Sequence, residues 1–117
     1  MESKAKRRPN VSRKRDIGEM ANLIGNSAAH AALYPDQEFM EKEVVVYMRL
    51  ASEVAAGRTW NDLEIGEFRE KARRRAESEI KRRIKEEGLN RRAFKDFMAT
   101  AESYINEFIE SEMRQRR

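Results

Sequence analysis

Apolar side chains recur at intervals of three and four residues along most of the chain, which is the spacing of one face of an α-helix. Turn signals at Pro35, Gly57 and Gly88 interrupt this spacing. Four periodic runs therefore predict four helices, near residues 14–33, 37–56, 60–87 and 91–115. We expect an all-α fold: a bundle of four antiparallel helices, two shorter and two longer, preceded by a disordered basic N-terminal arm.

The second run is ambiguous in one segment. Residues 43–50, Glu-Val-Val-Val-Tyr-Met-Arg-Leu, could form a strand on their β-branched content alone. The helical spacing continues on both sides, so we interpret the whole run as a helix, and its wide apolar surface predicts the most buried element of the fold. Glu43 lies on this otherwise apolar side. A buried carboxylate has a raised pKa or a partner, and we interpret Glu43 as an edge residue paired with an arginine or a tyrosine.

The third and fourth runs predict a long helical hairpin that overhangs the shorter pair. The apolar stripe of the third run has a strict spacing of four, so it drifts by roughly 40° per step around the helix. It consists of Ile65, Phe68, Ala72, Ala76, Ile80 and Ile84. The overhang would expose apolar ends that include Ile109 and Met113, and this predicts a homodimer or a larger assembly. Its interface would bury apolar residues of the fourth helix, among them Phe94, Phe97, Phe108 and Ile109.

Residues 20–35 contain no Asp, Glu, Lys or Arg, although 39% of the chain is charged. Small residues recur at three and four within and beside this stretch and form a ridge: Gly18, Ala21, Gly25, Ala28 and Ala32. Such a ridge lets another backbone approach closely, and a charge there would be desolvated without a partner. We interpret it as a packing surface against the second helix or a second copy of the chain. The alternative is a docking ridge for a partner helix.

His30 is the only histidine and the most obvious catalytic candidate. It lies about 120° around the helix from Ile24, off the apolar face. Catalysis would require a carboxylate that orients the ring, and neither Glu19 nor Asn26 has a diagnostic spacing. We therefore predict a structural or surface histidine, no catalytic residue and no enzyme. With one histidine, no cysteine and no Gly-rich phosphate loop, we also expect no metal site and no cofactor.

The charge of the chain is concentrated at its start. Residues 1–15 carry one acidic side chain, Glu2, and seven basic ones: Lys4, Lys6, Arg7, Arg8, Arg13, Lys14 and Arg15. This segment has a charge of +6, and because the whole chain has +4, the remainder sums to −2. The basic run of the third helix is different, because acidic residues precede its cations by four positions, which is a stabilising arrangement. The four pairs are Glu67–Lys71, Glu70–Arg74, Glu77–Lys81 and Glu79–Arg83. Four cations of the run have no such partner: Arg73, Arg75, Arg82 and Lys85.

An unpaired, flexible basic arm is typical of proteins that bind phosphates without sequence preference. We therefore expect a disordered arm over residues 1–12, a single helical domain over residues 13–117, and a role as a nucleic-acid-associated accessory or packaging protein that binds DNA or RNA. The partner could equally be an acidic protein surface. The main alternative function is a protein–protein adaptor or assembly module, and a phosphorelay module or enzyme centred on His30 is the third.

No stretch is apolar and long enough to span a bilayer, and no apolar signal region follows the basic start. We therefore expect a cytoplasmic protein without a membrane partner. The surplus of Glu, Lys and Arg, together with the absence of cysteine, resembles the composition of thermophile proteins.

Overall fold

The structure is a computed structural model that describes residues 9–36, 45, 48–53 and 59–114. Every regular element in these ranges is helical and none is a strand, which confirms the all-α fold of four helices. The elements are α2 (Pro9–Leu33), a helical stretch at residues 48–53, α4 (Asp62–Glu87), the 3₁₀ turn η1 (Arg91–Ala93), α5 (Phe94–Phe108) and the π-helical η2 (Ile109–Arg114). Residues 48–53 are helical and not extended, as predicted, whereas Glu43 lies outside the described residues.

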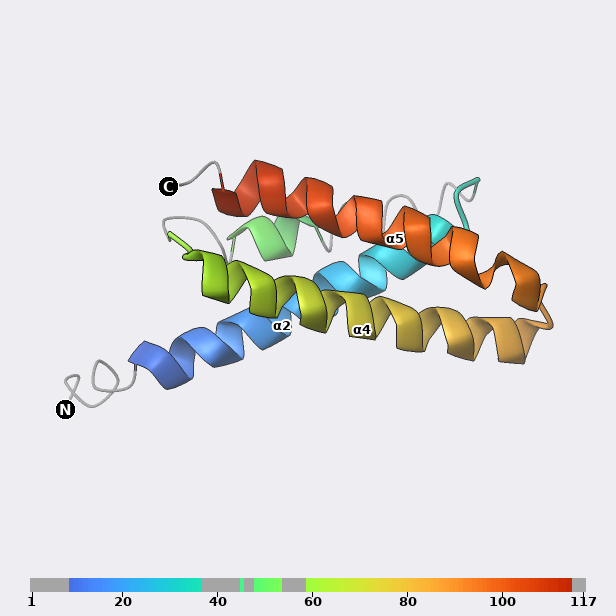
Figure 1. The fold of residues 1–117 in the computed structure, drawn as a ribbon, viewed down its shortest axis with the longest axis horizontal. Coiled ribbons are helices and arrows are strands. Elements are labelled where there is room, and N and C mark those ends of the chain that lie inside the picture. Colours follow the sequence, from blue (N-terminus) through green and yellow to red (C-terminus); the bar gives the residue numbers. More distant parts are fainter. Residues whose placement is uncertain (1–8, 37–44, 46–47, 54–58, 115–117) are drawn as a thin grey trace.

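The helices lie along one long axis, in a molecule that measures 52 × 25 × 22 Å. Figure 1 shows α2 and α4 running in the same direction, with α5 returning antiparallel beside α4. Helix α2 packs against both α4 and α5, and α4 also packs against α5. The three helices therefore enclose one core, with the carboxyl ends of α2 and α4 at the same end of the molecule as the α4–α5 turn.

Helix α2 begins earlier than its apolar spacing predicts. Its first residue is Pro9, which suits the first helical position because that position has no intrahelical partner for an N–H. Residues 9–12, which the sequence assigns to the arm, form the first turn of this helix. The helix has 25 residues, nearly as many as the 26 of α4.

Of the helices in the described part of the chain, α2 buries the largest share of its residues, whereas most of the second predicted helix, the expected most buried element, lies outside the described residues. Four consecutive residues of α2, from Ser27 to His30, are all buried, so this turn of the helix is covered on every side. In the described part of the second helix Ala51 is buried, but Val45 and Leu50 expose 53% and 44% of their surface. The physical reason is that α2 lies in contact with both other long helices.

Helix α4 is fixed at both ends by its own sequence. Asn61 caps it, since its side chain accepts a hydrogen bond from the Glu64 N–H at 2.8 Å while the Glu64 carboxylate accepts from the Asn61 N–H at 3.1 Å. Gly88 ends the helix in the left-handed conformation with φ 65°, which glycine adopts at little cost. The predicted stripe of α4 is buried along its whole length.

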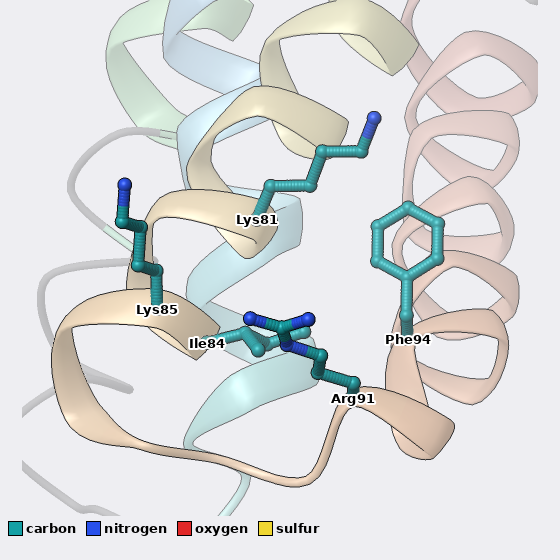
Figure 2. A pocket seen from close by; sticks show the side chains of 5 residues that line it. All are labelled: Lys81, Ile84, Lys85, Arg91 and Phe94. Atoms are coloured by element: carbon teal, nitrogen blue, oxygen red, sulfur yellow. The ribbon is translucent and has the colours of Figure 1, made fainter.

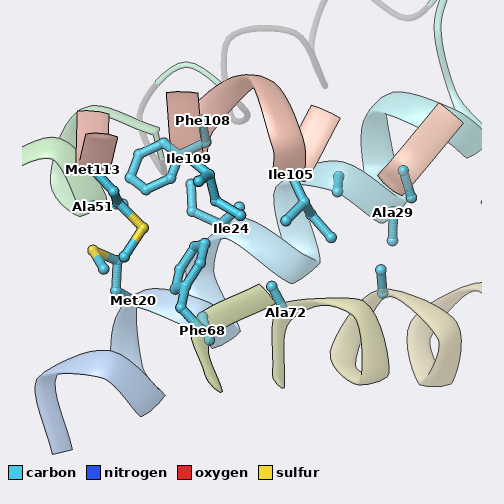
Figure 3. Packing of buried hydrophobic residues seen from close by; sticks show 14 of the residues in the cluster. Met20, Ile24, Ala29, Ala51, Phe68, Ala72, Ile105, Phe108, Ile109 and Met113 are labelled. Atoms are coloured by element: carbon cyan, nitrogen blue, oxygen red, sulfur yellow. The ribbon is translucent and has the colours of Figure 1, made fainter. Parts of the chain in front are cut away.

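The core lies where α2, α4 and the end of α5 meet (Figure 3). The rings of Phe68 and Phe108 are 5.6 Å apart, and both are fully buried. Ile109 and Met113 are also fully buried, so the expectation that they form exposed ends of an overhanging hairpin is wrong. A homodimer or larger assembly stays a prediction, and only the half-buried Phe94 and Phe97 of its expected interface are partly accessible.

No helix in the described part of the chain combines the length and the apolar character needed to cross a membrane.

Candidate functional site

The small-residue ridge of α2 lies inside the molecule. Ala21, Ala28 and Ala32 are buried, and Gly18 is half-buried. At Gly25 a Cβ atom would lie 2.7 Å from the carbonyl oxygen of Ala72 on α4, so the two backbones are in direct contact there. The ridge is thus a packing surface within the chain, and at Gly25 its neighbour is α4. Its buried residues offer no surface to a partner helix.

A cluster of charged and polar side chains joins the carboxyl end of α2 to α4. At its centre is Glu79, whose side chain is 8% exposed. One oxygen of this carboxylate, Oε2, accepts hydrogen bonds from Arg82 at 2.7 Å and from Arg83 at 3.0 Å. The same oxygen lies 3.7 Å from Nε2 of His30, while Nδ1 of His30 is buried without a partner in the described structure. His30 is therefore a buried residue that faces a carboxylate, so a surface position, one of the two alternatives predicted for it, is wrong.

A second carboxylate extends the cluster to the end of both helices. The Tyr34 hydroxyl donates to Oε2 of Glu87 at 2.6 Å, and Arg83 also donates to that oxygen at 3.1 Å. Desolvation and the hydrogen bond with Glu87 raise the pKa of Tyr34 to about 12. The hydrogen bond from Tyr34 is the main cause that lowers the pKa of Glu87. The cluster therefore fastens the last turn of α2 to the last turns of α4.

The chemistry of Glu79 favours a structural role. Burial raises its pKa, but the hydrogen bonds from Arg83 and Arg82 outweigh burial, so that the net pKa is lowered. A carboxylate that two guanidinium groups hold ionised is a weak proton acceptor, which is the opposite of what a general base needs near neutral pH. The pair of His30 and Glu79 thus resembles a structural clamp more than an acid–base pair.

We expect His30→Ala to lower the free energy of unfolding by roughly 1–2 kcal/mol, more than the roughly 0.5 kcal/mol of an ordinary surface substitution. The reason is that the ring is 7% exposed and its removal leaves a void between α2 and α4. Chemical denaturation of both proteins measures this difference. A change below about 0.5 kcal/mol would show that the ring contributes no packing.

The burial of Glu79 was not predicted from the sequence, although the position of this residue around the helix indicates it. Glu79 follows Ala72 by seven residues and Phe68 by eleven, so it lies within roughly 20° of each around the helix. It therefore belongs to the angular range of the apolar stripe. Its favourable spacing from Arg83 led instead to the interpretation of a solvated surface pair.

The basic run of α4 is neutralised within the helix. All four predicted pairs form, with N–O distances between 3.0 and 3.3 Å. Two of the cations expected to lack a partner also have one: Arg73 lies 3.2 Å from Glu70, and Arg82 contacts Glu79 and Glu86. A third, Arg75, donates to the Asn26 side chain of α2 at 2.9 Å. This run is accordingly no cationic binding stripe.

Cations without a carboxylate partner gather instead at the α4–α5 turn. Four exposed side chains have no carboxylate partner among the described residues: Lys85, Arg91, Arg92 and Lys95. The first two line a pocket, and this group is a cationic surface that the sequence did not indicate. Its members come from both sides of the turn, so no single run of sequence contains them.

Part of the predicted phosphate-binding segment belongs to the first turns of α2. Arg13, Lys14 and Arg15 belong to the first turns of α2, and Arg15 is exposed. These turns extend beyond the other helices at the end of the molecule opposite to the α4–α5 turn (Figure 1). The remaining predicted cations lie outside the described residues: Lys4, Lys6, Arg7 and Arg8.

Among the residues that the structure describes, no three His, Asp or Glu side chains are grouped so that they could hold a metal ion. Comparisons with protein families, with curated proteins and with solved structures found no match to this chain. The functional argument therefore depends on the charge distribution and on the geometry of the described surfaces.

Proposed function

We propose that this chain is a non-enzymatic, nucleic-acid-associated accessory protein in which the segment 1–15 contacts phosphates of DNA or RNA without sequence preference. The observation that carries the proposal is the contrast between two sets of cations. Those of α4 are held by carboxylates 3.0–3.3 Å away on the same helix. The segment 1–15 contains seven cations and one acidic side chain, so it has no comparable internal supply of carboxylates.

The helical start of α2 supports this proposal. Arg13 to Arg15 precede Ile17, a fully buried residue of the same helix, so the backbone that carries them is anchored to the core. A cation on an anchored helix loses less freedom on binding than one on a free chain. Phosphate contacts at this end therefore cost less conformational entropy than contacts by a wholly disordered arm.

The main competing proposal is a protein–protein adaptor. Its small-residue docking ridge is unsupported, because most of that ridge is buried inside the chain. Its remaining support is three exposed apolar side chains in the described part of the chain, Val45, Leu50 and Leu63, which expose 53%, 44% and 83% of their surface. A few exposed apolar residues are normal on a protein surface, so the nucleic-acid proposal is the stronger one.

The test uses a variant of the full-length protein, called the arm variant, in which alanine replaces four cations of the segment 1–15: Arg7, Arg8, Arg13 and Lys14. We expect the affinity for a short duplex to fall at least about tenfold at moderate salt. Each phosphate contact contributes roughly −0.9 to the slope of log affinity against log salt, and a wild-type slope of about −3 to −5 should fall by up to about 3.6. Fluorescence anisotropy with duplex DNA and duplex RNA, titrated against salt, measures both quantities.

The matched control removes two paired cations of α4, in the variant Lys71→Ala/Arg74→Ala, and should bind within about twofold of the wild type because these cations are already neutralised. Thermal melting should show that the arm variant stays folded, since alanine favours the helix at residues 13 and 14. An arm variant that binds both duplexes as tightly as the wild type, with the same salt slope, would exclude the proposal and favour the adaptor.

A further inference from the structure

A pocket of about 400 Å³ opens at the turn between α4 and α5. Its lining residues are Lys81, Ile84 and Lys85 of α4 with Arg91 and Phe94 from beyond the turn. Figure 2 shows Phe94 on α5 facing Lys81 across the opening, with Ile84 between the helices and Arg91 beside it. The volume is within the range of sites that bind small molecules, roughly 300–1,000 Å³.

The turn holds this pocket in place through backbone hydrogen bonds. The N–H groups of Gly88 and Leu89 both donate to the carbonyl oxygen of Ile84, the second at 3.0 Å. The Asn90 side chain then accepts from the N–H of Arg92 at 2.9 Å and starts the next helical turn. Only three residues separate the end of α4 from Arg91, so the Arg91 backbone is fixed beside Ile84. These hydrogen bonds therefore fix the backbone that carries the lining residues on both sides of the turn.

The lining combines an apolar surface with positive charge. Ile84 is 7% exposed, and the half-buried Phe94 ring forms one wall. The Nζ atom of Lys81 lies 5.7 Å from the centre of that ring, on which it makes a cation–π contact. Lys85 and Arg91 have no carboxylate partner in the described part of the chain, and no acidic residue lines the pocket. A matching ligand is flat, aromatic and anionic.

We propose that this pocket binds one unstacked nucleotide of single-stranded nucleic acid, with its base against Phe94 and its neighbouring phosphates beside Lys85 and Arg91. Aromatic side chains in a cationic groove bind single strands in this way, because every base has a π-face that can stack. An acidic peptide would pair with the cations but would leave the aromatic wall without a planar partner. The pocket adds what the arm lacks, since the segment 1–15 contains no aromatic side chain for stacking.

This proposal rests on the proposed function only in the class of ligand, because the pocket and the start of α2 lie at opposite ends of the molecule (Figure 1). The arm would contact any phosphate backbone, whereas the pocket requires a base that has left its stack. The pocket therefore predicts a preference for single strands over duplexes that the arm alone does not provide.

The test compares Phe94→Leu with Phe97→Leu in the full-length protein. Both phenylalanines are half-buried on α5, but only Phe94 lines the pocket. We expect Phe94→Leu to weaken binding of labelled oligo(dT) and oligo(U) at least about fivefold, the lower end of the effect of losing one stacked base. Phe97→Leu should bind within about twofold of wild type. Phe94→Trp, which keeps a stacking surface, should retain binding.

A second variant tests the charges without touching the core. Lys85→Ala/Arg91→Ala should reduce the salt slope for single strands by roughly 1.4, since each lost phosphate contact contributes about 0.7. Both residues are exposed, so this variant should melt like the wild type.

The outcomes separate the pocket from the arm. Equal binding by Phe94→Leu and Phe97→Leu, or an unchanged salt slope in the double variant, would overturn the pocket. Binding of a poly-glutamate peptide that is as tight as oligo(dT), and as sensitive to Phe94→Leu, would also overturn it and indicate an acidic protein partner. If the arm variant binds normally while Phe94→Leu weakens single-strand binding, the proposed function of the arm fails and the pocket stands.

Discussion

Gly25→Ala is expected to lower the free energy of unfolding by about 3 kcal/mol, at the upper end of the usual cost of overpacking. The added Cβ would lie 2.7 Å from the carbonyl oxygen of Ala72 and 2.7 Å from the Cβ atom of Arg75. A Cβ atom essentially never lies within 3.0 Å of a non-bonded heavy atom in folded proteins. The oxygen also belongs to the backbone of α4, which cannot move without shifting the helix. Helices α2 and α4 would have to separate along their whole contact. Chemical denaturation measures the loss.

Gly18→Ala is the matched control, because it makes the same chemical change on the same helix. No heavy atom lies within 4 Å of a Cβ at Gly18. Replacing a helical glycine with alanine then stabilises the protein by up to about 1 kcal/mol, since alanine loses less backbone entropy on folding. The two substitutions should therefore change stability in opposite directions. A stabilising effect of both would mean that α2 and α4 do not meet at Gly25.

The apolar spacing of the sequence predicts α4 and α5 well for a simple physical reason. Each has one apolar side that faces the core and one charged side that faces water, so that helical phase and burial agree. The buried stripe of α4 runs from Ile65 to Ile84 as expected. The ends of these helices also follow local rules, since Gly88 and Asn90 are residues that end and begin helices by themselves.

The burial of α2 could not be predicted from its spacing, because a helix made of small residues has no wide hydrophobic side. Its carboxyl half has few large apolar residues after Ile24 and gains its burial from neighbours on several sides. The absence of charge over residues 20–35 was the stronger signal. It indicates that much of the circumference is covered by neighbouring helices, and His30 is buried even though it lies off the face of the larger apolar residues.

The basic arm and the cations at the α4–α5 turn also differ in how far the sequence predicts them. The arm is visible in the sequence as seven basic residues that share the segment 1–15 with one acidic residue, Glu2. The cations at the α4–α5 turn are not, because Lys85 and Arg91 are brought together only when Gly88 reverses the chain. The spacing of an ion pair along the sequence also does not indicate whether its side chains are buried. Glu79 was for this reason interpreted as a surface residue.

Glu79→Gln is expected to lower the free energy of unfolding by about 2 kcal/mol at neutral pH. Removing one member of a buried ion pair costs about 3–5 kcal/mol when its partners are left unpaired and buried. Here the cost is smaller, because Arg82 retains Glu86 and Arg83 retains Glu87 after the change. The loss remains substantial, since the central oxygen of the cluster that joins α2 to α4 no longer carries charge.

The control is Glu77→Gln, two residues earlier on the same helix. The Glu77 side chain is 31% exposed and contacts only Arg73 and Lys81 of its own helix. Exposed pairs of this kind contribute at most about 0.5 kcal/mol. Denaturant unfolding of the three proteins at neutral pH should therefore place Glu77→Gln close to the wild type and Glu79→Gln well below it.

The pH dependence supplies a second, independent check on Glu79. Its pKa in the folded protein is lowered from the ordinary value of 4.5, so the ionised carboxylate stabilises the fold above that value, and the stabilisation is lost as the pH falls through the lowered folded pKa. Glutamine cannot titrate, so the stability of Glu79→Gln should change less with acid. The difference in the free energy of unfolding between the wild type and Glu79→Gln should thus decrease steadily below about pH 4.5. A gap that stays constant from neutral pH to about pH 3 would mean that Glu79 acts through its shape and not through its charge, because only the charge is removed by protonation.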